Sequence, residues 1–203
     1  IFYRFEKDLH KQKISVAVAV QKMVASEESG IAFSVHPVTQ DYNQLIIEAG
    51  FGLGEAIVSG QITPDSYVVE KEPRRIIDVN VNVQARALYR SEGGGNEWRN
   101  LSREKGESQV LTEEQILEFS EILLRIEKHY GFPVDVEWAR EKGKFYIVQS
   151  RPITTLAAKT TNAGVVADDD PWLLAEDIPD IDFQFSQIWL SSFVNDLHKT
   201  AGK

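Results

Sequence analysis

The sequence contains no cysteine. This absence excludes disulfide bonds, thiolate metal sites and a cysteine nucleophile, and it fits the reducing environment of the cytoplasm. No apolar run approaches the roughly 20 residues that a helix needs to span a bilayer. No positively charged segment followed by an apolar stretch opens the chain, as a secretory signal would. We therefore expect a soluble, cytoplasmic protein with no membrane partner.

Positive charge is also scarce. The 203 residues include 22 Lys and Arg against 31 Asp and Glu, a formal net charge of −9. Because a net negative charge repels polyanions, we expect no nucleic-acid partner, and a small anionic ligand would need cations close to it. The hydrophobic share of 42% and the aromatic share of 10% are ordinary for a chain that buries a core.

Local patterns predict many strands and one clear helix. Thr112 and Gln115 form a capping-box pattern, and an apolar stripe at spacings of three and four then runs from Ile116 to Tyr130, where Gly131 and Pro133 follow. A short helix is expected at 55–59, and residues 92–106 read as a polar excursion. The expected strands are 14–20, 30–35, 44–49, 66–70, 76–83, 134–140 and 144–151.

The composition changes near the C-terminal end. We expect one domain over 1–156, an exposed linker of small and acidic residues over 157–170, and an aromatic segment over 171–203 that begins a further domain or docks on a neighbour.

The last two strands predict a hairpin. Glu141, Lys142 and Gly143 read as a three-residue loop, in which position 140 would pair with position 144. Asp135 and Glu137 would then project from one face of the first strand.

The second strand of the hairpin places Gln149 and Arg151 on one face with Phe145 and Ile147. In the predicted register odd-numbered residues oppose odd-numbered residues, so four polar side chains would converge. Carboxylate and amide oxygens suit Mg²⁺, and a guanidinium can donate two hydrogen bonds to a phosphate. The alternative is a solvated hairpin face with an ordinary surface ion pair.

The hairpin sequence, from Val134 through Phe145-Tyr146-Ile147-Val148-Gln149-Ser150-Arg151-Pro152 to Thr155, resembles the closing hairpin of the nucleotide-binding domain in the phosphoenolpyruvate synthase and pyruvate phosphate dikinase family. The resemblance implies the C-terminal half of an ATP-grasp domain. Its fold class would be α/β (α+β), with a mostly antiparallel sheet and helices on one face. It also implies ATP and Mg²⁺ as ligands. In this resemblance Glu137 and Gln149 are metal ligands, Asp135 lies at or beside the metal, and Arg151 is the catalytic contact to phosphate.

A glycine loop, Gly50-Phe51-Gly52-Leu53-Gly54-Glu55-Ala56, follows the strand over 44–49. Glycines there would let the backbone approach a ligand, and the next helix would offer free N–H groups to an anion. A tight turn between strand and helix is the alternative. The segment is similar to the glycine loop of the same family, which implies that Gly52, Gly54 and Glu55 line the nucleotide site.

The run Val20-Gln21-Lys22-Met23-Val24 resembles the hinge that lines the adenine pocket in this family. The resemblance implies that Gln21, Lys22, Met23 and Val24 contact the base through main-chain groups and apolar side chains. For Met23, a plain core position is the alternative.

Two parts of the family pattern are absent from this sequence. One is the first half of the ATP-grasp domain, with its glycine-rich lid and phosphate-binding lysine. The other is the Thr-Gly-Gly motif with the histidine that carries the phosphoryl group, so none of the four histidines is a credible phosphohistidine. Because the chain begins with Ile1, we expect a fragment or processed chain that is incomplete for activity alone. Its partners would be the missing half and a phosphohistidine domain, in the same protein or a partner subunit.

Three functions remain open at this stage. The chain could serve a dikinase that phosphorylates pyruvate, or a phosphotransferase with another acceptor, as rifampicin phosphotransferase and phenylphosphate synthase have. The third possibility is a nucleotide-binding subunit without catalysis.

Overall fold

The computed structural model describes residues 20–153 and residue 156. Residues 20–22 belong to a different compact unit from residues 23–153, and the fold described below is that of the second unit. The strands are β1 Glu28–Phe33, β2 Gln44–Phe51, β3 Asp65–Glu70, β4 Arg75–Asn80, β5 Arg86–Arg90, β6 Asn96–Asn100, β7 Val134–Glu141 and β8 Lys144–Pro152. The helices are α2 Glu55–Val58, α3 Arg103–Gly106 and α4 Glu113–Tyr130.

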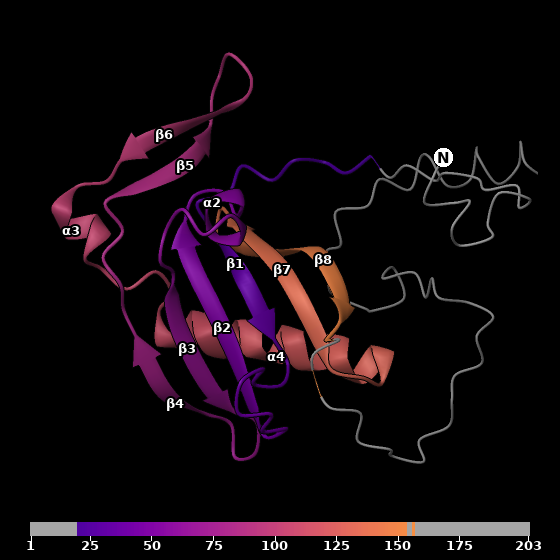
Figure 1. Ribbon diagram of the computed structural model, residues 1–203. Helices are drawn as coiled ribbons and strands as arrows, with labels where there is room; N and C mark the ends of the chain where they lie inside the picture. Colours follow the sequence, from indigo (N-terminus) through magenta and orange to yellow (C-terminus); the bar gives the residue numbers. More distant parts are fainter. Residues whose placement is uncertain (1–19, 154–155, 157–203) are drawn as a thin grey trace, which may run out of the picture. The chain divides into compact units, whose positions relative to one another are not determined.

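Six strands form one sheet in the order β4-β3-β2-β1-β7-β8, and every neighbouring pair of strands in it is antiparallel (Figure 1). The strands β5 and β6 pair with each other in a second, two-stranded sheet. The predicted α+β class with a mostly antiparallel sheet is therefore confirmed. In the described part of the chain, no helix is long and apolar enough to cross a membrane.

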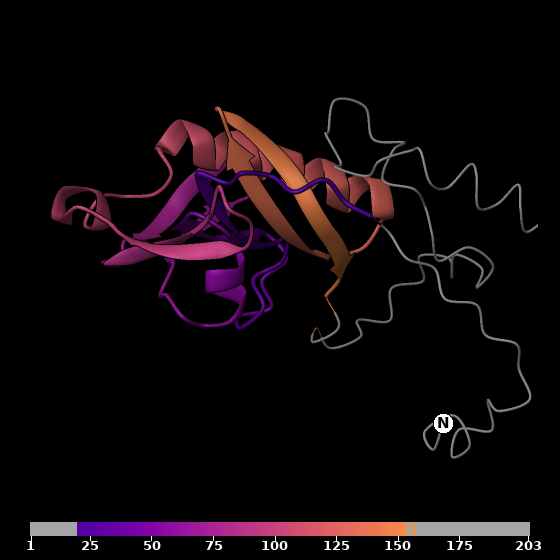
Figure 2. The ribbon, with the colours of Figure 1, turned by 90° about the horizontal axis from the view of Figure 1, so that it is seen from above.

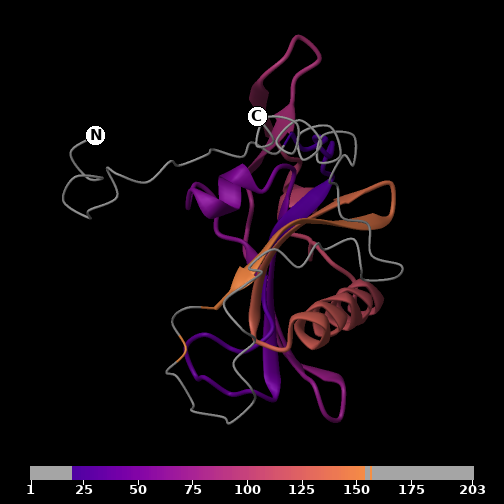
Figure 3. The same ribbon diagram turned by 90° about the vertical axis from the view of Figure 1, so that its right-hand side faces the viewer.

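The helix α4 covers one face of the large sheet, as the perpendicular views of Figures 2 and 3 show. Its capping box is formed as predicted, because the Gln115 backbone N–H donates to Thr112 Oγ1 at 3.3 Å and the Thr112 N–H donates to Gln115 Oε1 at 2.9 Å. Gly131 ends the helix at a φ of 73°. The apolar stripe of α4 meets the inward side chains of β2, β1 and β7. The buried core of this face includes Ile116, Phe119, Leu123, Ile126, Leu45, Ile47, Ala32, Val134, Val136 and Trp138.

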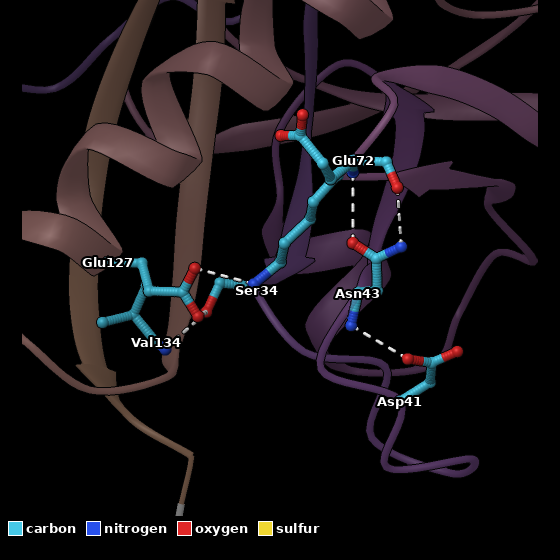
Figure 4. A network of polar contacts seen from close by, with 7 residues as sticks. Ser34, Asp41, Asn43, Glu72, Glu127 and Val134 are labelled. Atoms are coloured by element: carbon cyan, nitrogen blue, oxygen red, sulfur yellow. Dashed lines mark hydrogen bonds and ion pairs between the residues drawn. The ribbon is translucent and has the colours of Figure 1, made fainter.

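A partly buried polar network fixes the C-terminal end of α4 to the sheet (Figure 4). The Ser34 hydroxyl donates to Glu127 Oε1 at 3.0 Å and accepts from the Val134 N–H at 2.9 Å. The other oxygen of Glu127 pairs with Lys71 Nζ at 2.7 Å. The network therefore ties α4 to the residues that directly follow β1 and β3 and to the first residue of β7.

Two parts of the fold differ from the sequence prediction. The segment 92–106, interpreted from the sequence as a polar excursion, contains β6 and α3, and β6 pairs with a strand β5 that was not predicted. Arg86 lies over the ring of Trp98 at 4.2 Å, a cross-strand contact within this hairpin. The strand β4 also ends at Asn80 rather than at residue 83. The predicted strand 14–20, apart from Val20, the linker 157–170 and the segment 171–203 lie outside the described residues.

Candidate functional site

The hairpin of β7 and β8 turns through two residues, not three. Glu141 pairs with Lys144, which leaves Lys142 and Gly143 as the loop. Both loop residues have positive φ, 52° and 80°, the conformation of a tight hairpin turn that matches strand twist. The predicted pairing of position 140 with position 144 was therefore wrong, because the first strand continues one residue further.

A β-bulge then changes the register within the hairpin. Trp138 pairs with Ile147, but Glu137 pairs with Gln149, so Val148 is an extra residue on β8. The prediction that Gln149 and Arg151 share a face with Phe145 and Ile147 was consequently wrong. Phe145 and Ile147 are buried in the core beneath α4, and the bulge lets the two polar residues point to the other side.

The convergence of the four polar side chains survives these corrections. Glu137 is directly opposite Gln149, and Asp135 is directly opposite Arg151. Directly paired residues point to the same side of a sheet. Val134, Val136 and Trp138 occupy the α4 side, so the four polar residues lie on the uncovered side, called the open face below.

The open face continues across the neighbouring strands. Glu137 pairs with Ile31 of β1, which pairs in turn with Glu48 of β2. The row Glu48, Ile31, Glu137 and Gln149 therefore crosses four strands. A second row beside it holds Ile46, Phe33, Asp135 and Arg151. The open face thus combines apolar side chains with carboxylates, an amide and a guanidinium.

Glu48 is a candidate site residue that the sequence reading missed. It is half-buried, its side chain makes no hydrogen bond or ion pair to another described residue, and its burial raises the pKa of its carboxyl. The signal in the sequence that could have identified Glu48 was an acidic residue within an otherwise apolar strand. An acid whose pKa is shifted by its surroundings is a frequent feature of functional sites.

Arg151 is held by an ion pair with Asp135. Arg151 Nε donates to Asp135 Oδ2 at 2.7 Å, and the Asp135 side chain is 9% exposed whereas that of Arg151 is 60% exposed. The hydrogen bond from the guanidinium to Asp135 and the charge of that carboxylate raise the pKa of Arg151 above its ordinary value. The guanidinium therefore stays charged and is presented at the surface of the open face.

Glu137 and Gln149 form the donor pair that best fits a divalent cation. Neither side chain has a hydrogen bond or ion pair to another described residue, so their oxygens are available. Within residues 20–153, no three acidic or histidine side chains come together as a protein cage for a metal. Mg²⁺ is commonly held by one or two protein oxygens, with waters and substrate phosphates filling the other positions. The pair therefore fits Mg²⁺ that arrives together with a phosphate ligand.

The glycine loop lies beside the open face. Gly50 is two residues after Glu48 on β2, so a Cβ at this position would point to the open face. That Cβ would meet the side chains of Ile57 and Ile62 at 3.0 and 2.9 Å. The single turn of α2 thus packs over the end of the open face, on the side of the sheet away from α4 (Figures 2 and 3). Gly50 permits this close packing.

Gly52 and Glu55 have structural contacts of their own. Gly52 has a φ of 81°, its N–H donates to Glu27 O at 2.8 Å, and a Cβ there would collide with the carbonyl oxygen of Leu88. Glu55 is exposed and accepts a hydrogen bond from Asn96 Nδ2 at 2.8 Å. Gly54 caps α2 at a φ of −60°. Through these contacts the loop joins β2, β5 and α2, which gives it a structural role. That the loop lines a nucleotide site stays a prediction.

Substituting Gly52 with alanine is expected to destabilise the protein by more than about 1 kcal/mol, because alanine is strained at positive φ and its methyl group meets backbone. Gly54→Ala is the matched control, since Gly54 has negative φ and the nearest atom to its Cβ is 3.6 Å away. Chemical denaturation of both variants measures the difference. Equal stability of the two variants would contradict this role for Gly52.

The predicted hinge residues show mixed exposure. Gln21, Lys22 and Met23 are exposed, Met23 at 57%, whereas Val24 is buried at 7%. The core alternative for Met23 is therefore not supported. The proposed contacts of these four residues with a base remain predictions.

Comparison with known proteins relates this chain to phosphotransferases. Over 156 residues it is 44% identical to a probable phosphoenolpyruvate synthase of Methanocaldococcus jannaschii, an alignment that covers 77% of this chain and 13% of that protein. It is 44% identical over 168 residues to the phosphoenolpyruvate synthase of Pyrococcus furiosus, covering 79% of this chain and 21% of the relative. The rifampicin phosphotransferase of Bacillus subtilis is 41% identical over 156 residues, covering 77% of this chain and 18% of the relative.

These relatives are several times longer than the matched region, so the chain corresponds to one part of each of them. The family model described as the AMP/ATP-binding domain of pyruvate phosphate dikinase matches residues 1–170. That match includes the whole of the open face and the glycine loop. The chain therefore belongs to the family of pyruvate phosphate dikinase AMP/ATP-binding domains.

Proposed function

We propose that this chain is the C-terminal half of an ATP-grasp domain and that its open face binds the phosphates of Mg-ATP for a dikinase-type phosphotransferase. The observation that carries the proposal is the pairing of Glu137 with Gln149, directly beside the charged guanidinium of Arg151, on the sheet face that α4 leaves uncovered. The set combines oxygen donors for a hard cation with a cationic donor for phosphate. Membership of an ATP-binding family supports the identity of the ligand.

Each residue has a separate task in this proposal. Glu137 and Gln149 would hold Mg²⁺, which supplies positive charge to neutralise the phosphates. The Nη groups of Arg151 would donate to phosphate oxygens and stabilise the charge that develops on the transferred phosphoryl group. Met23 and Val24 would contact the adenine, and the loop with Gly52, Gly54 and Glu55 would border the nucleotide.

The apolar part of the open face has a complementary use. Ile31 lies between Glu48 and Glu137 in the first row, and Phe33 lies between Ile46 and Asp135 in the second. Ile31, Phe33 and Ile46 are all only partly buried. They would exclude water from one side of the phosphates, which strengthens the electrostatic contacts of the site.

The phosphoryl acceptor would lie outside this chain. We propose that a phosphohistidine domain receives the phosphoryl group, and that the N-terminal half of the ATP-grasp domain closes the site from the other side. Both could be parts of the same cytoplasmic protein, as the small share of the relatives' length that this chain covers suggests. Pyruvate is the acceptor that we favour, because phosphoenolpyruvate synthases recur among the relatives.

A second acceptor class is also supported. The similarity to a rifampicin phosphotransferase is nearly as high, 41% against 44%, so the nucleotide module alone does not separate the two acceptor classes. The same open face would serve either, since the difference would lie in another domain.

A product assay on the complete protein tests the proposal. With ATP and Mg²⁺ we expect AMP and phosphate to form, together with phosphoenolpyruvate when pyruvate is present. Formation of AMP with a rifamycin as the phosphorylated product would select the second acceptor class. Formation of ADP would contradict a dikinase, and no turnover of ATP with either acceptor would support a nucleotide-binding subunit without catalysis.

A further inference from the structure

Asp135 is placed to control the side chain of Arg151. We propose that Asp135 is a positioning residue, which orients the guanidinium of Arg151 toward a phosphate ligand, and that it does not bind the metal ion. This inference rests on the proposed function, because it concerns how the same open face holds phosphate. It replaces the metal role that the sequence resemblance implied for Asp135 with a role based on its contacts.

The contact between the two side chains leaves part of the guanidinium unused. The bond joins Asp135 Oδ2 to Nε of Arg151, at 2.7 Å, rather than to the two Nη groups. Each Nη group is therefore left to donate to a ligand, in the forked geometry that matches phosphate oxygens. A carboxylate that bound both Nη groups would instead compete with phosphate for the same donors.

The backbone sets the direction of this contact. Asp135 and Arg151 are directly opposite each other on adjacent antiparallel strands and point to the same side of the sheet. The side chain of Asp135 is 9% exposed, so it has little freedom to move, whereas that of Arg151 is 60% exposed. A fixed partner restricts a long side chain that would otherwise lose considerable rotamer entropy when phosphate binds.

The same geometry argues against Asp135 as a metal ligand. Its Oδ2 is taken by Arg151, and its Oδ1 is covered by protein with no hydrogen-bond partner among the described residues. A hydrated Mg²⁺ reaches its ligands from the solvent side, where neither oxygen of Asp135 is open to it. Glu137 and Gln149 are the accessible oxygen donors of the same hairpin.

A double-mutant cycle in the complete protein tests the inference. The dissociation constants of ATP, with saturating Mg²⁺, and of adenosine are measured by calorimetry for the wild type, Asp135→Ala, Arg151→Ala and the double variant. We expect Asp135→Ala to weaken ATP binding about tenfold and to add little once Arg151 is already alanine, because coupled residues are not additive. Adenosine affinity should not change, since adenosine has no phosphate for Arg151 to bind, whereas a general structural defect would weaken both ligands.

A matched control and a conservative variant complete the test. Glu70→Ala removes a comparable carboxylate, which pairs with Arg75 Nε at 2.6 Å across β3 and β4, and it should leave both affinities unchanged. Asp135→Asn keeps an acceptor for Nε but removes the charge, so we expect a loss of at least about threefold in ATP affinity even if Asp135→Ala fails to fold.

Three results would overturn the positioning role while leaving ATP binding intact. They are an unchanged ATP affinity in both Asp135 variants, additive losses in the double variant, and a rise in the Mg²⁺ concentration needed for ATP binding that is confined to the Asp135 variants. The last result would make Asp135 a metal ligand. Absence of ATP binding by the wild-type protein would instead remove the proposed function, and the inference with it.

Discussion

Arg151→Ala is expected to lower phosphoryl transfer from ATP by about 10³-fold or more in the complete protein, because an arginine that stabilises phosphoryl charge commonly contributes that much. The side chain is largely exposed and contributes no core packing, so the variant should keep its fold. Rapid-quench measurement of phosphoryl transfer from labelled ATP measures the loss, and circular dichroism checks the fold.

Arg75→Ala is the matched control for Arg151→Ala. Arg75 has a similarly exposed side chain, 65% against 60%, and it also pairs through Nε with a carboxylate on the adjacent strand. It lies on β4, at the other edge of the sheet, and its replacement should leave the transfer rate unchanged. Retained transfer in Arg151→Ala would remove Arg151 from its proposed role, and an equal loss in both variants would point to a general effect of removing surface charge.

Glu137→Gln is expected to weaken the response to Mg²⁺ by about 10- to 100-fold, a loss typical of damage to a metal site. The substitution keeps the size of the side chain and one oxygen, but it removes the negative charge that attracts the cation. Transfer from ATP is measured as a function of Mg²⁺ concentration, and we expect the curve to move to higher concentration, with partial recovery at saturation.

Glu141→Gln provides the control on the same strand. Glu141 is four residues along β7 from Glu137, so it points to the same side of the sheet. It lies at the turn, however, where its backbone is opposite that of Lys144. The Mg²⁺ dependence of this variant should match that of the wild type. If Glu137→Gln also matched the wild type, the metal site would have to lie elsewhere.

The local signals in the sequence were enough to predict α4. Its cap depends on Thr112 and Gln115, three residues apart, and its buried face depends on spacings within a single helix. Both are short-range features, so the residues themselves specify them.

The register of the site hairpin depends on more than local pattern. Along β8 the odd positions change from apolar Phe145 and Ile147 to polar Gln149 and Arg151. A regular strand would place all four on one face, and the bulge at Val148 resolves this conflict by burying the first two and exposing the others. The change from apolar to polar side chains at the odd positions was a sign of a bulge. The position of the bulge, however, is determined by which side chains pack into the core beneath α4.

Glu48 and the β5–β6 hairpin could not be placed from the sequence for a related reason. The strand β2 is apolar at nearly every position, so its pattern does not reveal which face is open. That face is defined only once β1 is found between β2 and β7, a long-range pairing. Likewise, β5 pairs with β6 across a glycine-rich turn in a polar segment with little periodicity.

A crystal structure of the complete protein with Mn²⁺ and a non-hydrolysable ATP analogue tests the central claim most directly. We expect an anomalous metal peak within about 2.2 Å of oxygens from Glu137 and Gln149, with phosphate oxygens in hydrogen-bond reach of the Arg151 Nη groups. Nucleotide and metal bound away from this hairpin, with the open face of the sheet empty, would contradict it.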